Sequence, residues 1–128
     1  ALTSGIDKQR CLECLKLVGL HDVGNKRIKD YSLGMKQRLG LATAILANPK
    51  ILILDEPTRG IDVGAKSEIY AIMNNLVKTG VSIIMISSEL PEIINMSDRV
   101  YVMAGGVVRG CINREEISQE SIMHLAAI

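Results

Sequence analysis

Apolar residues recur at helical spacing in the first third of the chain. A first helix is predicted from an N-cap at Asp7 to about Val18, and a short basic helical turn is expected over residues 24–30. Ser32 then precedes a second helix that ends at Asn48–Pro49. One apolar face of this second helix combines Met35, Leu39, Ala42, Ile45 and Leu46. This part of the chain is therefore predicted to be helical.

The pattern then changes from helical spacing to continuous apolar runs. Residues 51–54 form such a run, which Asp55 and Glu56 stop. A short run of this kind is typical of a parallel strand buried on both faces. Asp62 is a candidate N-cap for a third helix, and residues 81–86 form a second buried strand. Strand, helix and strand in this order predict a right-handed crossover between parallel strands.

The final third predicts smaller elements. A short helix follows Pro91, residues 99–103 and 107–112 form a hairpin around two glycines, and Ser118 is a candidate cap for a last helix. No internal repeat is present. The whole pattern predicts an α/β fold, with a parallel sheet, flanking helices and a helical portion before them.

The composition is that of a globular chain, with 48% hydrophobic and 23% charged residues among 128. This length allows one domain at most. No apolar run approaches the roughly 20 residues of a membrane-spanning helix, and charged side chains interrupt the start of the chain, where a secretory signal would need an apolar core. A cytoplasmic setting is therefore expected.

Charge is unevenly distributed along the chain. Residues 1–50 carry nine Lys and Arg against four Asp and Glu, whereas residues 51–128 carry six against ten. The basic part could face phosphates or nucleic acid. Because a single-strand binder needs aromatic stacking platforms, and the chain has three Tyr, no Phe and no Trp, no nucleic-acid partner is expected.

Three cysteines in a chain without a secretion signal indicate reduced thiols. Cys11 and Cys14 form one CxxC motif, but Cys111 and the histidines give no second paired spacing for a four-ligand zinc site. The favoured interpretation is an apolar helical stripe that contains both cysteines. A metal or redox role remains the alternative.

Two adjacent acids follow the first predicted strand. Ligands of open parallel sheets bind beyond the carboxyl ends of the strands, which is where Asp55 and Glu56 would lie. A carboxylate at the strand end can reach a hydrated Mg²⁺, and the next can accept a proton from a water that attacks a phosphate. The alternative is a solvated turn without chemistry.

A hydroxyl and a glycine stand at the predicted start of the second helix. Ser32, Gly34 and the free amides of a helix start can form an anion pocket, and Lys36 and Arg38 would raise the positive potential there. Such a pocket suits a terminal phosphate. Taken alone, the same residues describe an ordinary helix cap.

Together these segments resemble the ATP-binding-cassette (ABC) ATPases, over nearly the whole chain. Residues 31–38 (Tyr-Ser-Leu-Gly-Met-Lys-Gln-Arg) resemble the family signature, residues 51–58 (Ile-Leu-Ile-Leu-Asp-Glu-Pro-Thr) the Walker B strand, and residues 59–62 (Arg-Gly-Ile-Asp) the D-loop. The resemblance implies part of a P-loop NTPase-like fold. It divides the chain into a portion of the helical signature subdomain over residues 1–48 and an α/β portion over residues 49–128.

The resemblance also implies roles for individual residues. Asp55 would serve Mg²⁺, Glu56 would be the general base, and Asp62 would couple the two sites of a cassette dimer. The signature residues would hold the γ-phosphate of an ATP bound to the opposite cassette; they are Ser32, Leu33, Gly34 and Met35. ATP and Mg²⁺ are thus the implied cofactors. A second cassette and membrane permease subunits are the implied partners, which would hold the protein at the inner face of the membrane.

Two departures from the family pattern change this picture. The chain contains no GxxxxGK[ST] segment, so it lacks a P-loop for the α- and β-phosphates. It is therefore expected to be the second half of a cassette, inactive alone, with an exposed sheet edge that favours dimers or low solubility. Ser88 stands where the family usually has a switch histidine, and His21 and His124 are expected to be ordinary surface or packing residues.

The signature segment and the later part of the chain resemble different subfamilies. The signature segment, residues 31–39, has Leu33 where the signature usually has Gly and resembles bacitracin- or lantibiotic-type exporters, whereas residues 54–66 and 86–89 resemble sugar importers. Leu33 would add a side chain beside the phosphate pocket. A fusion of two genes, a recombinant or simple divergence would explain the two resemblances. Sugar import coupled to ATP hydrolysis is the favoured function. The alternatives are antibiotic-peptide export, a catalytically silent dimerisation module and a soluble cassette of translation or DNA repair.

Overall fold

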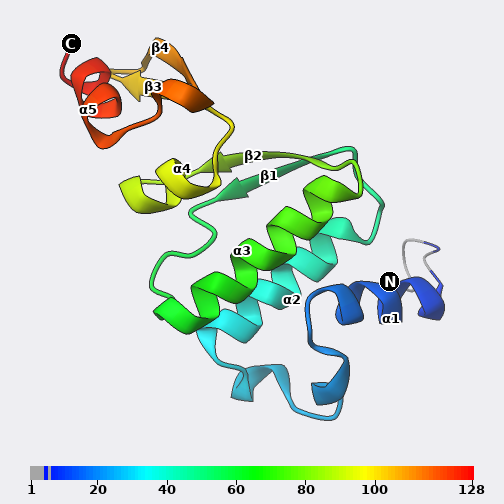
Figure 1. Cartoon of the computed structure of the whole chain (residues 1–128). Helices are drawn as coiled ribbons and strands as arrows, with labels where there is room; N and C mark the ends of the chain where they lie inside the picture. Colours follow the sequence, from blue (N-terminus) through cyan, green and yellow to red (C-terminus); the bar gives the residue numbers. More distant parts are fainter. Residues whose placement is uncertain (1–4, 6) are drawn as a thin grey trace. The chain divides into compact units, whose positions relative to one another are not determined.

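The computed structural model describes residue 5 and residues 7–128, which form two compact units. The first unit runs to Ile86 and the second comprises Ser87–Ile128 (Figure 1). The elements of the first unit are, in order, α1 (Lys8–Leu17), the short 3₁₀ turns η2 (His21–Val23) and η3 (Ile28–Asp30), α2 (Leu33–Ile45), β1 (Ile51–Asp55), α3 (Val63–Lys78) and β2 (Ser82–Ile86). The predicted order of helices and strands is confirmed.

The N-terminal ends of the three long helices are capped as predicted. The side chain of Asp7 accepts a hydrogen bond from Arg10 N, that of Ser32 from Met35 N and that of Asp62 from Ala65 N. Each cap satisfies one of the amides that a helix start leaves without an intrahelical acceptor. The three predicted helix starts are therefore confirmed.

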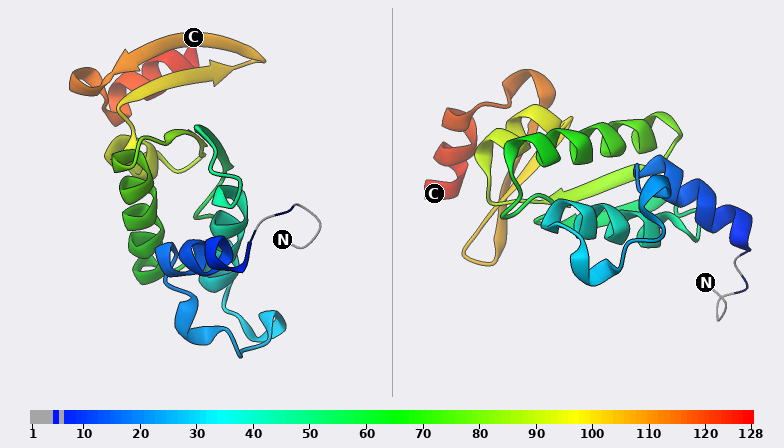
Figure 2. Two further views of the ribbon diagram at one scale, coloured as in Figure 1. Left: turned by 90° about the vertical axis from the view of Figure 1, so that its right-hand side faces the viewer. Right: turned by 90° about the horizontal axis from the view of Figure 1, so that it is seen from below.

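Helix α2 ends earlier than predicted, and Arg10 contributes to this end. The helix stops at Ile45, ahead of the predicted Asn48–Pro49. Arg10 Nη2 donates to the carbonyl of Ile45 at 2.7 Å and Arg10 Nε to that of Leu46 at 3.3 Å. These bonds satisfy carbonyls that the last turn of a helix cannot pair internally. They also join α1 to α2, which pack against each other (Figures 1 and 2).

The parallel pairing of β1 with β2 is confirmed, but their predicted burial on both faces is wrong. Leu52, Leu54, Ile83 and Met85 are buried or partly buried on the side to which α3 packs, and α2 in turn packs against α3. On the other side, Ile51, Ile53, Ile84 and Ile86 are between 52% and 64% exposed. Within the described residues of the first unit, helices pack on only one face of this sheet, and the apolar run therefore has an exposed side.

The second unit contains α4 (Leu90–Met96), β3 (Arg99–Ala104), β4 (Val107–Asn113), the 3₁₀ turn η4 (Arg114–Glu116) and α5 (Gln119–Ala127). Its two strands form the predicted antiparallel hairpin, with a bulge between Val102 and Met103. The core combines Val100, Val102, Ile112 and Ile122. Ser118 caps α5 in a reciprocal arrangement with Ser121, as predicted for the start of this helix.

None of the described helices is both long enough and apolar enough to span a bilayer. The described residues also contain no cluster of three or more His, Cys, Asp or Glu side chains that could hold a metal ion by themselves. Cys14 is buried in α1 and Cys11 is partly buried, which agrees with the apolar stripe predicted for the CxxC segment.

Candidate functional site

The carboxyl end of β1 presents two adjacent acids in different surroundings. Asp55 is the last residue of the strand, pairs with Ile86 of β2 and is exposed. Glu56 is partly buried and has a φ of 48°, a left-handed conformation that is uncommon for residues other than glycine. Its amide donates to the carbonyl of Ile86 at 2.8 Å. This bond joins the chain to the neighbouring strand just where it leaves the sheet.

The segment after Glu56 folds into a compact loop. The amide of Arg59 donates to the carbonyl of Glu56 at 3.2 Å, and that of Ile61 donates to the carbonyl of Thr58 at 3.1 Å. Thr58 is fully buried, and Gly60 has a φ of 74° that favours glycine. Two successive turns anchored by a buried residue thus connect Glu56 to Asp62, which caps α3.

The start of α2 combines exposed and buried residues. Ser32 Oγ accepts a hydrogen bond from Met35 N at 3.2 Å, and Ser32 and Leu33 are both exposed. Gly34 is buried. The first turn of a helix presents amides and a partial positive charge, so this end of α2 can accept an anion.

The structure brings the start of α2 together with the loop before α3. A Cβ added to Gly34 would lie 2.9 Å from Ala65 Cβ and 3.9 Å from Ile61 Cγ2, so only a glycine allows this approach. Ala65 also donates its amide to Asp62 Oδ1 at 3.0 Å. Ala65 therefore contacts both predicted site segments. Sequence reasoning missed it, because an alanine in the first turn of a helix carries no chemical signal of its own.

Asp55 lines a pocket with residues of α2. The pocket has a volume of about 130 Å³. It is lined by Gln37, Gly40, Leu41, Ile53, Leu54, Asp55 and Pro57. Gln37 is the polar residue of α2 that lines this pocket, and sequence reasoning had given it no role. Gln37 lies one helical turn after Leu33, on the same side of the helix, and this spacing could have indicated it as a candidate.

Arg38 has a structural role that the sequence did not indicate. Its guanidinium Nη1 donates to the carbonyl of Val18 at 3.3 Å and lies 3.3 Å from Glu68 Oε2. The side chain thus links α2 to the end of α1 and to α3. It does not supply a free positive charge to the start of α2, as the sequence had suggested, whereas Lys36 is exposed.

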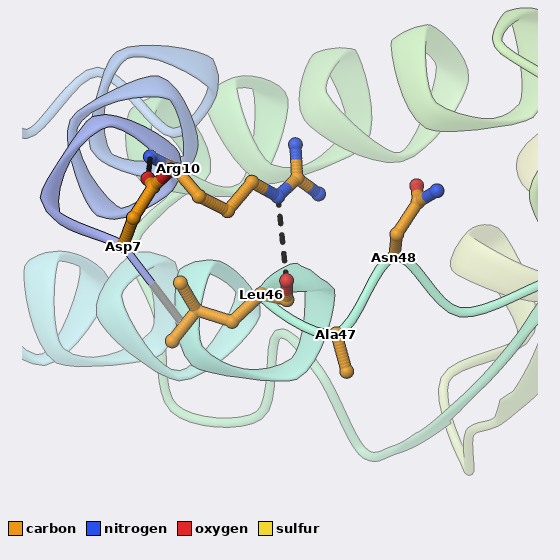
Figure 3. Close-up of a pocket in the computed structure, with 5 residues that line it drawn as sticks. All are labelled: Asp7, Arg10, Leu46, Ala47 and Asn48. Atoms are coloured by element: carbon orange, nitrogen blue, oxygen red, sulfur yellow. Dashed lines mark hydrogen bonds between the residues drawn. The ribbon is translucent and has the colours of Figure 1, made fainter. Parts of the chain in front are cut away.

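A second, wider pocket lies at the other end of α2 (Figure 3). It has a volume of about 480 Å³ and is lined by Asp7, Arg10, Leu46, Ala47 and Asn48. The Arg10 guanidinium donates hydrogen bonds to carbonyls at the end of α2; the dashed line in Figure 3 marks the bond to Leu46. None of the predicted site residues lines this pocket.

The remaining candidates belong to other segments of the chain. Ser88 is exposed in the second unit, between β2 and α4. His21 Nε2 lies 3.0 Å from Asp22 Oδ1 at the surface, and His124 is an exposed residue of α5. Both histidines are therefore surface residues, as expected.

Comparison with known proteins gives a consistent assignment. Residues 3–59 match the family described as ABC transporter. The chain is 53% identical to the ribose import ATP-binding protein RbsA of Shouchella clausii over 89% of its own length and 23% of that protein. It is 47% identical to RbsA of Bacillus cereus over 98% of its length and 26% of that protein. The xylose import ATP-binding protein XylG of Moorella thermoacetica is 54% identical over 78% of the chain and 20% of that protein.

Solved structures show the same fold. CbiO1 from Clostridium perfringens, described as part of the ABC transporter complex CbiONQ, has 31% identity and a TM-score of 0.79 over 91% of this chain and 47% of its own. The ATP-binding cassette MJ1267, at 23% identity, has a TM-score of 0.82 over 91% of this chain and 48% of its own, which shows the fold. The chain thus spans about a quarter of the curated relatives and about half of these solved cassettes. It belongs to the ATP-binding domains of the ABC transporter family, of which it forms a part.

Proposed function

We propose that this chain contributes part of a composite ATP-hydrolysing site in an ABC transporter subunit that drives sugar import. One observation carries the proposal: the Ser32–Met35 segment and the loop that holds Glu56 and Asp62 are joined through Gly34 and Ala65. The phosphate-binding amides at the start of α2 and the carboxylates of the loop are thereby held together in the first unit. Residues 1–48 contribute the helical signature portion and residues 49–128 the α/β portion.

Asp55 fits a role in Mg²⁺ binding. It is an exposed carboxylate at the carboxyl end of a parallel strand, and it lines a pocket together with Gln37. Mg²⁺ keeps several waters and is held by one or two carboxylates together with substrate phosphates. When bound, the ion would neutralise charge on the phosphates.

Glu56 fits the role of general base. Its carboxylate would accept a proton from a water molecule whose oxygen forms a bond to the γ-phosphorus, while the bond from that phosphorus to the ADP oxygen breaks. The hydrogen bond from its amide to Ile86 and the turn to Arg59 hold its backbone. A general base of this kind contributes about 10²–10⁴-fold to a rate.

The start of α2 would bind the γ-phosphate of an ATP held by a second cassette. Ser32, the exposed Leu33 and the amides of the first helical turn form the anion-binding end of the helix. The amide of Met35 already donates a hydrogen bond to the Ser32 hydroxyl. The P-loop that holds the other phosphates would come from the opposite cassette. Asp62 would couple the two sites, and Ser88 would take the place of the switch histidine.

The proposed cargo and partners follow from the relatives. Three of them are named as ribose or xylose import ATP-binding proteins at 47–54% identity. We therefore propose a sugar as cargo and permease subunits as partners, which would hold the protein at the cytoplasmic face of the membrane.

The test replaces the matching segment of Shouchella clausii RbsA with this chain and measures ATP hydrolysis by the hybrid. Glu56→Gln should lower kcat by about 10²–10⁴-fold, since a general base is lost. Glu115→Gln is the matched control, because Glu115 is an exposed residue of η4 outside the proposed site. Equal rates for both variants would overturn the proposal and favour a silent dimerisation module. The chain alone is expected to give no heat when titrated with Mg-ATP.

A further inference from the structure

We propose that Arg38 is a positioning residue that orients the start of α2 relative to α3, so that Ser32 and Asp62 meet the opposite cassette in a fixed relation. The proposal rests on the function proposed above and adds a residue that supports it. Arg38 lies six residues after Ser32 in α2. Glu68 lies six residues after Asp62 in α3. Arg38 Nη1 lies 3.3 Å from Glu68 Oε2, so one ion pair joins the two helices shortly after their capping residues.

The same guanidinium nitrogen also reaches the end of α1. Arg38 Nη1 donates to the carbonyl of Val18 at 3.3 Å. The next residue, Gly19, has a φ of 68° that favours glycine, and a Cβ there would crowd Arg38 Nη1 at 3.2 Å. Val18 and Leu20, on either side of this glycine, are buried. The turn after α1 is therefore shaped to receive the guanidinium.

The ion pair crosses the boundary between the two portions proposed above. Helices α1 and α2 lie in residues 1–48, whereas α3 lies in residues 49–128, directly after Asp62. Helix α2 packs against both α1 and α3 (Figure 1). Arg38 therefore joins the helical signature portion to the α/β portion through a single charged group.

This arrangement is costly for a side chain that serves packing alone. Arg38 Nε is buried and has no hydrogen-bond acceptor in the part of the chain that the structure describes, and such a donor costs free energy. Glu68, which balances the charge, is more than half exposed, so the ion pair adds little to stability. An apolar side chain of similar length would fill this space at a lower cost. The orientation that the charge sets between the helices accounts for it better than stability does.

The expected consequence is a change in the apparent affinity for ATP. Ser32 is proposed to contact the γ-phosphate of an ATP held by the opposite cassette, so a rotation of α2 against α3 would weaken this contact. An interaction that is present both before and during the reaction affects KM rather than kcat when it is lost. Arg38 itself touches no phosphate and acts through the placement of Ser32 relative to Asp62.

The test uses the RbsA hybrid described above, with Glu68→Gln and Glu68→Lys, which change only the exposed partner of Arg38. Glu68→Gln should raise KM for ATP about two- to fivefold with kcat changed less than about twofold. Glu68→Lys should raise KM about tenfold, because it places a like charge beside the guanidinium. The matched control is Glu115→Lys, the same charge reversal at an exposed residue of η4, which should leave both constants unchanged.

Salt gives a second readout that a purely structural role would not move. Salt screens an ion pair between partly exposed groups. The difference in KM between the unchanged hybrid and Glu68→Gln should therefore shrink at high salt. A difference that is independent of salt would contradict a role for the charge.

The outcomes separate this inference from the proposed function. If Glu56→Gln lowers kcat but both Glu68 variants behave like Glu115→Lys, the positioning role of Arg38 is wrong while the function stands. If Glu56→Gln has no effect, the function itself fails. A loss of kcat with unchanged KM in the Glu68 variants would also overturn the inference, because it would not act through the contact of Ser32 with ATP.

Discussion

Ile53 and Ile84 are paired neighbours on parallel strands, and both are more than half exposed, at 64% and 53%. Apolar side chains that stand together on an open sheet face are unusual, because parallel sheets are normally covered on both sides. Leu52, one residue away, is buried on the opposite face. The two faces of the same strand therefore have different energetic roles in this chain.

Substitutions on the two faces of β1 should have opposite outcomes. Ile53→Lys should change the free energy of unfolding by less than about 0.5 kcal/mol and reduce self-association, because it places a charge on an exposed apolar face. Leu52→Ala should lower stability by about 2–5 kcal/mol, since it removes a buried side chain. Urea titration and sedimentation velocity measure both effects. Equal destabilisation by the two variants would show that the Ile53 face is covered.

The close approach of Gly34 to Ala65 predicts a compensating pair. Gly34→Ala should destabilise the chain by about 1–3 kcal/mol, because the new methyl would meet Ala65 Cβ at 2.9 Å. Adding Ala65→Gly should recover part of this loss, apart from the cost of a glycine in α3. A double-mutant cycle of chemical unfolding measures the coupling. Strictly additive effects would mean that the two residues do not touch.

Arg38 and Glu68 should contribute unequally to stability. Arg38→Leu loses the hydrogen bond to the Val18 carbonyl as well as the ion pair, so a loss of about 1–3 kcal/mol is expected. Glu68 is more than half exposed, and Glu68→Gln should cost less than about 1 kcal/mol. Urea unfolding of both variants makes the comparison. A larger loss for Glu68→Gln would contradict the role given to the Val18 bond.

The Ser32 hydroxyl has a capping role that can be separated from phosphate binding. Ser32→Ala should remove the bond to Met35 N and cost about 1 kcal/mol, whereas Ser32→Asp should keep the cap and the stability. In the RbsA hybrid, however, Ser32→Asp should slow ATP hydrolysis, because it places a negative charge where a phosphate is proposed to bind. Unfolding and turnover measured on the same samples distinguish the roles. Full activity of Ser32→Asp would rule out a phosphate at this position.

The Cys14 thiol should make stability depend on pH in the alkaline range. Burial raises the pKa of Cys14 above 9.0; the positive charge of Arg10 opposes this, while Cys11 and Glu13 add to it. The folded state therefore disfavours the thiolate, so this contribution is complete below about pH 9 and is lost as the pH rises through the raised pKa. Cys14→Val should flatten the pH dependence of unfolding. An unchanged slope in this variant would assign the effect to another group.

Local sequence determined the secondary structure of this chain to within a few residues. The caps at Asp7, Ser32, Asp62 and Ser118 each bind an amide three residues further along, so their partners lie within the same short segment. The spacing of apolar residues similarly separates helices from strands. The end of α2 at Ile45 is an exception, because it is bound by Arg10 from a distant helix.

Tertiary structure alone decided how the candidate site is assembled. The sequence identified Asp55 and Glu56 from their place after a strand, and Ser32 and Gly34 from their place before a helix. It could not show that Ala65 lies against Gly34, that Arg38 points to Val18 and Glu68, or that one face of β1 and β2 is open. The physical reason is that periodicity and capping depend on neighbours a few residues away. Packing between elements depends on residues 20 or more positions apart, whose meeting only the folded chain determines.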